Sequence, residues 1–304
     1  MRAVWLPMLA ALACGARQQF FDLGDFALEN GEVVRGCRIG YRTYGSLDAA
    51  GSNAVLVAPW LMGTSREVAA QIGPGKLVDS SRYFVVAVDA LGNGVSTSPS
   101  NSRAQPGARF PAFSMRDMVE SEHRLVTRGL GLRHLRAVVG ISAGGMQVFQ
   151  WATAHPGFFD KAVAVAASPR STAAERASWA RLGAGGREPG WKRAARAAGQ
   201  GSPIEAARQL RIDADDLARQ AQAIAGQDVT APFGGSMERA AAAVRARMLV
   251  AVSRRDEVVD PAPALEFAGL LRGQVLELDG RCGHHATVCE KATLWAAVAK
   301  FLDE

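Results

Sequence analysis

One short segment of the chain combines a nucleophilic side chain with the backbone freedom to present it. Residues 140–144 read G-I-S-A-G, follow an apolar run over 135–139, and open a segment over 143–155 with helical character. A strand that turns into a helix through G-x-S-x-G is typical of a nucleophile elbow, in which the serine stands at the apex of a tight turn. The helix start also supplies backbone N–H groups and a positive dipole end. The pattern predicts Ser142 as a nucleophile for acyl chemistry.

An acid and a base must assist this serine, because a hydroxyl at its ordinary pKa is a poor nucleophile. In chains with this elbow the acid and then the histidine follow the serine in sequence. The acid is expected just beyond a late strand, and 248–253 has the apolar composition of such a strand. We predict Asp256 as the acid, with Asp260 and Glu257 as rivals. The alternative is that Asp256 is only a solvated partner of the two arginines before it.

The base is expected beyond the last strand, 274–278. His284 lies in the loop that follows, and the glycine before it gives the backbone freedom to aim the imidazole ring. His285 is the alternative base. No third ligand accompanies this His-His pair at a fitting spacing, so we expect no metal site there, and no cofactor is expected.

The rest of the chain supplies the elements that must position these side chains. Strand-like and helix-like segments alternate, which predicts an α/β fold with a mostly parallel, doubly wound sheet. Strands are expected at 21–28, 33–44, 53–60, 83–89, 137–141, 162–167, 248–253 and 274–278, the first two joined by a turn at Asn30-Gly31. Helices are expected at 68–77, 114–129, 143–154, 262–271 and 287–302.

The alternation stops between residues 171 and 246, where alanine, arginine and glutamine dominate. We predict that 171–246 forms a helical cap inserted into a core made of 20–170 and 247–304. Such a cap shapes a substrate pocket and excludes water from it. The alternative is a low-complexity insertion, against which the interspersed large apolar residues argue.

Composition excludes some classes of partner. The 304 residues are 48% hydrophobic and 21% charged, which is ordinary for a globular protein. The net charge is +6, but no basic run alternates with aromatic residues, so nucleic acid is not an expected partner. A small-molecule acyl substrate is expected instead, and a homodimer is compatible with the sequence.

The first nineteen residues differ from the rest. A positively charged start, an apolar stretch over 3–13 and small residues near 11–16 predict a signal peptide over 1–19, too short to span a bilayer. We therefore expect a periplasmic or secreted protein, with Cys14 as a candidate lipid anchor; a buried apolar N-terminus is the alternative. In an oxidising compartment Cys282 and Cys289 can pair around the His284 loop, although free thiols fit the sequence equally well.

Stabilisation of an oxyanion requires a second backbone donor beside the N–H of Ala143. The turn after the strand that ends near Trp60 is the natural source, and it reads L-M-G-T-S over 61–65. We predict Leu61 as this donor, with Met62 as the next choice and as a substrate contact.

With these pieces in place, the chain resembles the α/β-hydrolase superfamily and, within it, the branch of homoserine O-acetyltransferases and their hydrolase relatives. The residues that carry the resemblance are 53–57, 61–65, 89–94, 140–147, 150–152, 155–156 and 283–286. The resemblance covers about 20–302 apart from the cap. It implies an acyl-enzyme mechanism with Ser142 as nucleophile, His284 as base and Asp256 as orienter, and it makes Arg170 a candidate substrate contact.

The departures from the branch lie where substrate identity is decided. Homoserine acetyltransferases resemble one another in a cap helix with an asparagine–glutamate pair followed by an arginine, but here no asparagine occurs after Asn101. An export signal is also awkward for an enzyme that uses acetyl-CoA. Our hypothesis is therefore a serine hydrolase of a small ester or related acyl compound. The alternatives are an O-acyltransferase and a catalytically silent binding protein on the same fold.

Overall fold

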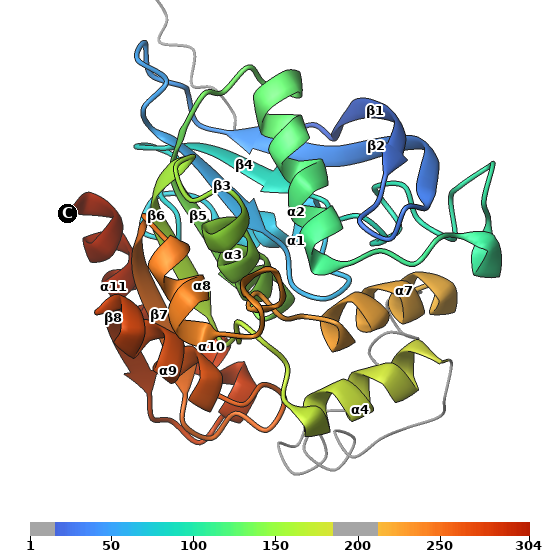
Figure 1. The fold of residues 1–304 in the computed structure, drawn as a ribbon. Coiled ribbons are helices and arrows are strands. Elements are labelled where there is room, and N and C mark those ends of the chain that lie inside the picture. Colours follow the sequence, from blue (N-terminus) through green and yellow to red (C-terminus); the bar gives the residue numbers. More distant parts are fainter. Residues whose placement is uncertain (1–15, 185–211) are drawn as a thin grey trace, which may run out of the picture.

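An eight-stranded sheet forms the centre of the protein, in a computed structural model that describes residues 16–184 and 212–304 (Figure 1). The strand order is β1-β2-β4-β3-β5-β6-β7-β8. The strands are β1 Gln19–Ala27, β2 Val33–Tyr44, β3 Ala54–Ala58, β4 Phe84–Val88, β5 Leu135–Ile141, β6 Phe159–Val165, β7 Arg247–Ser253 and β8 Gln274–Leu278. The β1–β2 and β2–β4 pairs are antiparallel and the other neighbours are parallel. The predicted fold class is confirmed.

Helices cover both faces of this sheet (Figure 1). They are α1 Ser65–Val68, α2 Met115–Arg124, α3 Ala143–Ala154, α4 Ala173–Gly183, α7 Ala214–Ala225, α8 Met237–Ala243, α9 Ala262–Leu271, α10 Ala286–Cys289 and α11 Lys291–Asp303. Side chains alternate along each strand, so Leu56 joins the core under α2, α3, α8 and α9, while Val55 and Val57 join the core under α1 and α11. Strands buried on both faces explain the continuous apolar runs of the central strands.

Three helices differ from the sequence-based expectation. The helix expected at 68–77 is instead the short α1 followed by a 3-10 turn, Ala69–Gln71, because Thr64 caps an earlier start. The helix expected at 114–129 changes after α2 into a π-helical segment, Leu125–Gly129. The last expected helix, 287–302, is broken at Glu290 into α10 and α11.

Between β6 and β7 the described residues form helices and turns. Helices α4 and α7 lie side by side away from the sheet (Figure 1), and Gln222 of α7 donates a hydrogen bond to the Gly183 carbonyl of α4 at 3.0 Å. Helix α8, by contrast, packs against α3 and α9. Residues 185–211 of the predicted cap lie outside the described residues, as do residues 1–15 of the predicted signal peptide.

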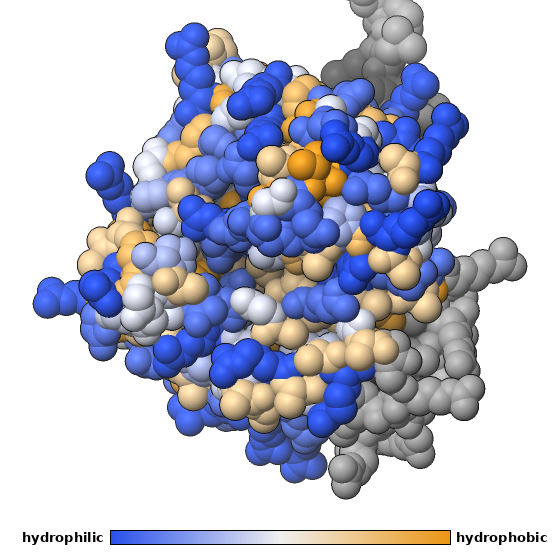
Figure 2. Space-filling model, turned by 45° about the vertical axis from the view of Figure 1, so that its right-hand side comes forward, coloured by the Kyte–Doolittle hydropathy of each residue, from blue (hydrophilic) through white to orange (hydrophobic). Residues whose placement is uncertain are grey.

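The face shown in Figure 2 is mostly hydrophilic, with apolar residues confined to small areas. No helix within 16–184 and 212–304 has the length and apolar character needed to cross a lipid bilayer.

Candidate active site

Ser142 stands at a sharp turn between β5 and α3. Its backbone is left-handed, with φ 57° and ψ −123°, a conformation that costs a non-glycine residue about 1–3 kcal/mol and is held by the surrounding structure. Its N–H donates to the carbonyl of Val165 at 2.8 Å. A Cβ at Gly140 would lie 2.2 Å from the Gly144 oxygen, and one at Gly144 would lie 2.3 Å from the Ala58 oxygen. The two glycines are therefore required by close backbone packing around the serine.

The structure brings the three predicted side chains together. The Nε2 atom of His284 lies 2.9 Å from Oγ of Ser142, and its Nδ1 atom lies 2.7 Å from Oδ2 of Asp256. The Asp256 side chain is 3% exposed, and its Oδ1 accepts the N–H groups of Val258 and Val259 at 2.9 Å each. A carboxylate fixed in this way favours a proton on Nδ1, which leaves the Nε2 lone pair directed at the serine hydroxyl.

The rival residues are placed elsewhere. Asp260 accepts the N–H of Ala262 at 2.9 Å, at the start of α9. Glu257 is exposed. His285 is exposed as well. Within the described residues, none of the three rivals forms a hydrogen bond with Ser142.

Two backbone N–H groups beside the serine remain available for an oxyanion. Ala143 is the first residue of α3, where N–H groups have no partner within the helix. Leu61 lies in the turn after β3, which is next to the elbow because Gly144 packs against Ala58. Among the residues that the structure describes, neither N–H donates to a protein acceptor, whereas the N–H of Met62 donates to Oε1 of Gln220 at 2.8 Å.

A buried carboxylate that the sequence analysis did not single out holds this turn. Asp89, after β4, is fully buried and accepts both the N–H and the hydroxyl of Ser65, at 2.7 and 2.8 Å. Asn93 donates to the carbonyl of Gly63 at 3.0 Å. The pattern D-A-L-G-N-G directly after a buried strand is the sequence signal for this network.

Helix α7 provides a second support, which no sequence motif indicates. The side-chain oxygen of Gln220 accepts from Met62, whose φ is 58°, and its nitrogen donates to the Leu91 carbonyl at 3.1 Å. One turn earlier, Asp216 accepts the N–H and hydroxyl of Ser100, at 2.8 and 2.5 Å, and burial raises its pKa to about 6. Both residues lie in a stretch of repetitive Ala, Arg and Gln composition, so no local pattern marks them.

Hollow space adjoins the turn 61–65, named the oxyanion turn after the role predicted for Leu61. A cavity of about 410 Å³ is lined by Trp60, Leu61, Met62, Thr64, Glu67, Asn93, Gly94, Val95, Ser100, Ile212, Asp213 and Asp216. A much tighter recess, with no room for a water molecule, is lined by Trp60, Ala90, Met115, Met118, Ala143, Gln147, Gln220 and Ile224. The recess is mostly apolar and reaches the first residue of the elbow helix.

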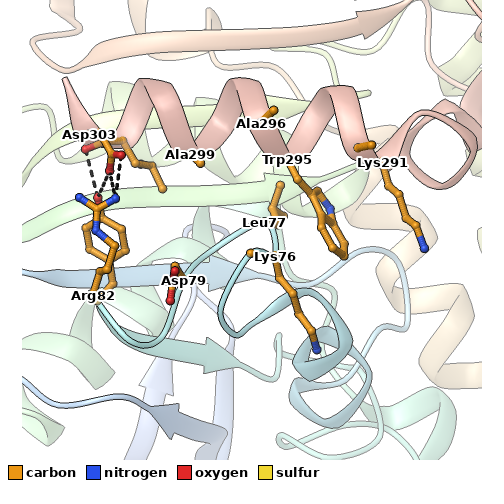
Figure 3. Close-up of a pocket in the computed structure, with 13 residues that line it drawn as sticks. Lys76, Leu77, Asp79, Arg82, Lys291, Trp295, Ala296, Ala299 and Asp303 are labelled. Atoms are coloured by element: carbon orange, nitrogen blue, oxygen red, sulfur yellow. Dashed lines mark hydrogen bonds and ion pairs between the residues drawn. The ribbon is translucent and has the colours of Figure 1, made fainter.

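Another cavity, of about 450 Å³, lies between α11 and the segment 75–83 (Figure 3). Trp295 and Ala299 line its helical side, and the Arg82–Asp303 ion pair lies at one end. None of its lining residues belongs to the loops that carry Ser142, Asp256 and His284.

The predicted substrate contacts have different surroundings. Met62 is buried and lines the 410 Å³ cavity. Arg170 follows β6 and forms an isolated backbone bridge with Asp228. The pKa of Glu238 is lowered mainly by the Ser236 hydroxyl, and the charge of Arg170 adds to this effect.

One cluster in the described part of the chain has metal-ligand composition. Glu120, His123 and His155 place ligand atoms within 4.8 Å of one another at the far end of α3. The two imidazole rings stack at 3.8 Å with 11° between their planes, so their in-plane lone pairs run parallel. One ring would have to turn before both could bind the same ion.

Comparisons with known proteins agree with this architecture. A family model described as alpha/beta hydrolase fold matches residues 54–200. The acetylester hydrolase structure from Corynebacterium glutamicum superposes with a TM-score of 0.83 at 23% identity, covering 95% of this chain and 96% of that one. The homoserine O-acetyltransferase structure from Bacillus anthracis gives 0.80 at 22%, covering 95% and 98%. The chain has the α/β-hydrolase fold.

The chain is also similar in sequence to curated hydrolases and acetyltransferases. The chain is 36% identical over 158 residues to an ethyl acetate hydrolase from Pseudomonas veronii, covering 51% of this chain and 45% of that protein. It is also 36% identical over 167 residues to a homoserine O-acetyltransferase from Methanococcoides burtonii, covering 49% and 34%. The matches thus span less than half the length of these two relatives. They confirm the resemblance to the homoserine O-acetyltransferase-like branch and support an enzyme.

Proposed function

We propose that this protein is a serine hydrolase that cleaves a small ester or related acyl compound through an acyl-enzyme. The observation that carries the proposal is the continuous hydrogen-bonded chain from Asp256 through His284 to Ser142, with distances of 2.7 and 2.9 Å. The N–H groups of Leu61 and Ala143 beside it, which have no acceptor among the described residues, support an oxyanion site.

In the proposed reaction, Oγ of Ser142 attacks the substrate carbonyl while Nε2 of His284 accepts the hydroxyl proton. Asp256 stabilises the imidazolium that forms, and the N–H groups of Leu61 and Ala143 donate to the oxyanion. Each such donor contributes about 3–4 kcal/mol to stabilising the transition state. The imidazolium then protonates the departing alcohol. Water, deprotonated by the same nitrogen, attacks the acyl-enzyme and releases the acid.

Hydrolysis is favoured over transfer from a coenzyme A thioester by the charge near the site. Among the described residues, Glu67, Asp213 and Asp216 contribute carboxyl groups to the 410 Å³ cavity beside the oxyanion turn. A polyanionic acyl donor would meet charge of its own sign there.

A fluorophosphonate probe tests the nucleophile. We expect labelling of the wild-type protein and of Ser178→Ala, a change in α4 away from the elbow, together with hydrolysis of short-chain esters such as ethyl acetate. Ser142→Ala should lose both. Labelling that persists undiminished in Ser142→Ala would contradict the assignment. Absence of both labelling and turnover in the wild-type protein would favour a silent binding protein.

The names of several relatives make O-acyl transfer to homoserine the second candidate. Incubation with an acyl donor, with and without homoserine, separates the two. Free acid as the main product in both incubations supports hydrolysis, whereas O-acylhomoserine formed with little water-only turnover supports transfer.

We also propose that the protein works in the periplasm or outside the cell. The disulfide between Cys282 and Cys289 supports this, because such bonds persist in oxidising compartments. Fractionation of cells that express the full chain, against a variant lacking residues 1–19, tests the location. Full-chain protein found only in the cytoplasm would refute it.

A further inference from the structure

The loop that carries His284 has little hydrophobic anchorage. It follows β8, the edge strand of the sheet, and leads into α10 and α11. Between Leu278 and Leu294, which are buried, Ala286 is the one buried residue. Packing of apolar side chains therefore contributes little to fixing this loop.

A covalent bond and two close contacts hold this loop instead. Cys282 and Cys289 form a disulfide that encloses His284 in a short ring of residues. Glu290 accepts the N–H of Gly280 at 2.9 Å. Gly283, with φ 54°, packs so closely on the Arg255 carbonyl that a Cβ would lie 2.8 Å from it, which sets the histidine beside the Asp256 loop.

We propose that the Cys282–Cys289 disulfide is a positioning element for His284, which makes turnover depend on the oxidised state of this bond. The proposal rests on the proposed function, since it concerns the base of that reaction. Opening the ring leaves Ser142 and Asp256 in place, because both lie on other elements, but it releases the imidazole from its position between them.

The bond is accessible to a reductant. Cys289 is exposed, and its neighbour Val288 is 65% exposed. A small dithiol attacks the disulfide as a thiolate and passes through a mixed disulfide. The reductant gives up two electrons and two protons and becomes a cyclic disulfide, while Cys282 and Cys289 become two thiols. Cys37, the free cysteine of the described residues, is buried and outside this exchange.

The test compares the oxidised wild-type enzyme, the same enzyme in dithiothreitol, and Cys282→Ser/Cys289→Ser. Peptide mapping without reduction first checks that the two cysteines are linked. We then expect kcat per folded protein, with folding followed by near-ultraviolet circular dichroism, to fall about 10- to 100-fold on reduction or in the double variant. KM should change less than about twofold, because displacing His284 does not alter the residues that bind the substrate.

Controls separate positioning from general stabilisation. Cys37→Ala should respond to dithiothreitol as wild type does, the double variant should not respond, and reoxidation should restore the activity of wild type. Unlinked cysteines in the peptide map, or wild-type kcat in the double variant below its melting temperature, would overturn the proposal. Failure of the proposed function looks different, because Ser142 would then escape fluorophosphonate labelling in the oxidised wild-type enzyme.

Discussion

Replacing Gln220 tests whether α7 controls the oxyanion turn. In Gln220→Leu a side chain of similar volume can make neither of the two hydrogen bonds, to the Met62 N–H at 2.8 Å and the Leu91 carbonyl at 3.1 Å. Each orphaned buried group costs about 1–3 kcal/mol. Part of that cost is recovered if the turn moves to reach water, and such a movement displaces the Leu61 N–H from the oxyanion.

The expected effect follows from the value of that donor. Complete loss of one oxyanion donor lowers kcat about 10²- to 10³-fold, and partial displacement should cost about 10- to 100-fold. KM should change little, because the donor acts mainly on charge that develops in the transition state. The assay is steady-state hydrolysis of a short-chain ester, with thermal unfolding measured in parallel.

Gln222→Leu is the matched control, two residues further along α7. It removes the bond to Gly183 of α4 and the contact with Arg219, but it leaves the oxyanion turn untouched. We expect a lower melting temperature with kcat near that of wild type. If Gln220→Leu also lost only stability and kept the kcat of wild type, the coupling between α7 and the oxyanion turn would be refuted.

Three further changes probe the elbow, the acid and the core. Asp256→Asn should lower kcat in ester hydrolysis about 10⁴-fold, because the imidazole then takes the wrong tautomer. Asp260→Asn should leave kcat nearly unchanged, and equal losses in the two variants would contradict the assignment. Gly144→Ala should strongly lower the melting temperature, because its Cβ would lie 2.3 Å from the Ala58 carbonyl oxygen. The control Gly269→Ala places its Cβ in open space in α9 and should leave the melting temperature unchanged or slightly raised. Burial raises the pKa of Glu122 to about 8 from 4.5, so the folded protein keeps a proton that the unfolded chain releases, and stability falls as the pH rises between these values. Glu122→Gln should therefore exceed the free energy of unfolding of wild type by less than about 1 kcal/mol at pH 5 and by about 4 kcal/mol at pH 8, measured in urea titrations. Equal stability of the two proteins at both pH values would show that Glu122 is ionised when folded.

Local backbone chemistry explains why much of the elbow could be predicted. The glycines at 140 and 144 have no alternative, since any Cβ would collide with backbone atoms. The apolar run before Ser142 is buried on both faces of the sheet as β5, and α3 has the predicted bounds 143–154. The last strand, 274–278, also has its predicted bounds because glycine and polar residues flank it closely.

The supports of the site could not be predicted, because they depend on contacts between residues far apart in sequence. Gln220 and Met62 are 158 residues apart, and no periodicity relates a cap glutamine to a turn amide. Ser65 and Asp89 are separated by 24 residues, and only the folded sheet shows that β3 and β4 bring their loops together. The break between α10 and α11 at Glu290 could not be predicted for the same reason. It accompanies a hydrogen bond from the Gly280 N–H to the Glu290 side chain, ten residues away.

The register of the sheet explains how residues 142, 256 and 284 meet although 114 residues separate the first two. Ile141 of β5 pairs with Val165 of β6, and Val165 pairs with Ala251 of β7, so parallel strands end at one edge. The register continues from Ser253 to Leu278 at the end of β8. A slip of one residue between the central strands would exchange the side chains of the two cores on either face of the sheet, so packing fixes the register. The first two positions are thus set by the core within three residues of their strands, while His284 stands six residues beyond β8 and depends on what its own loop supplies.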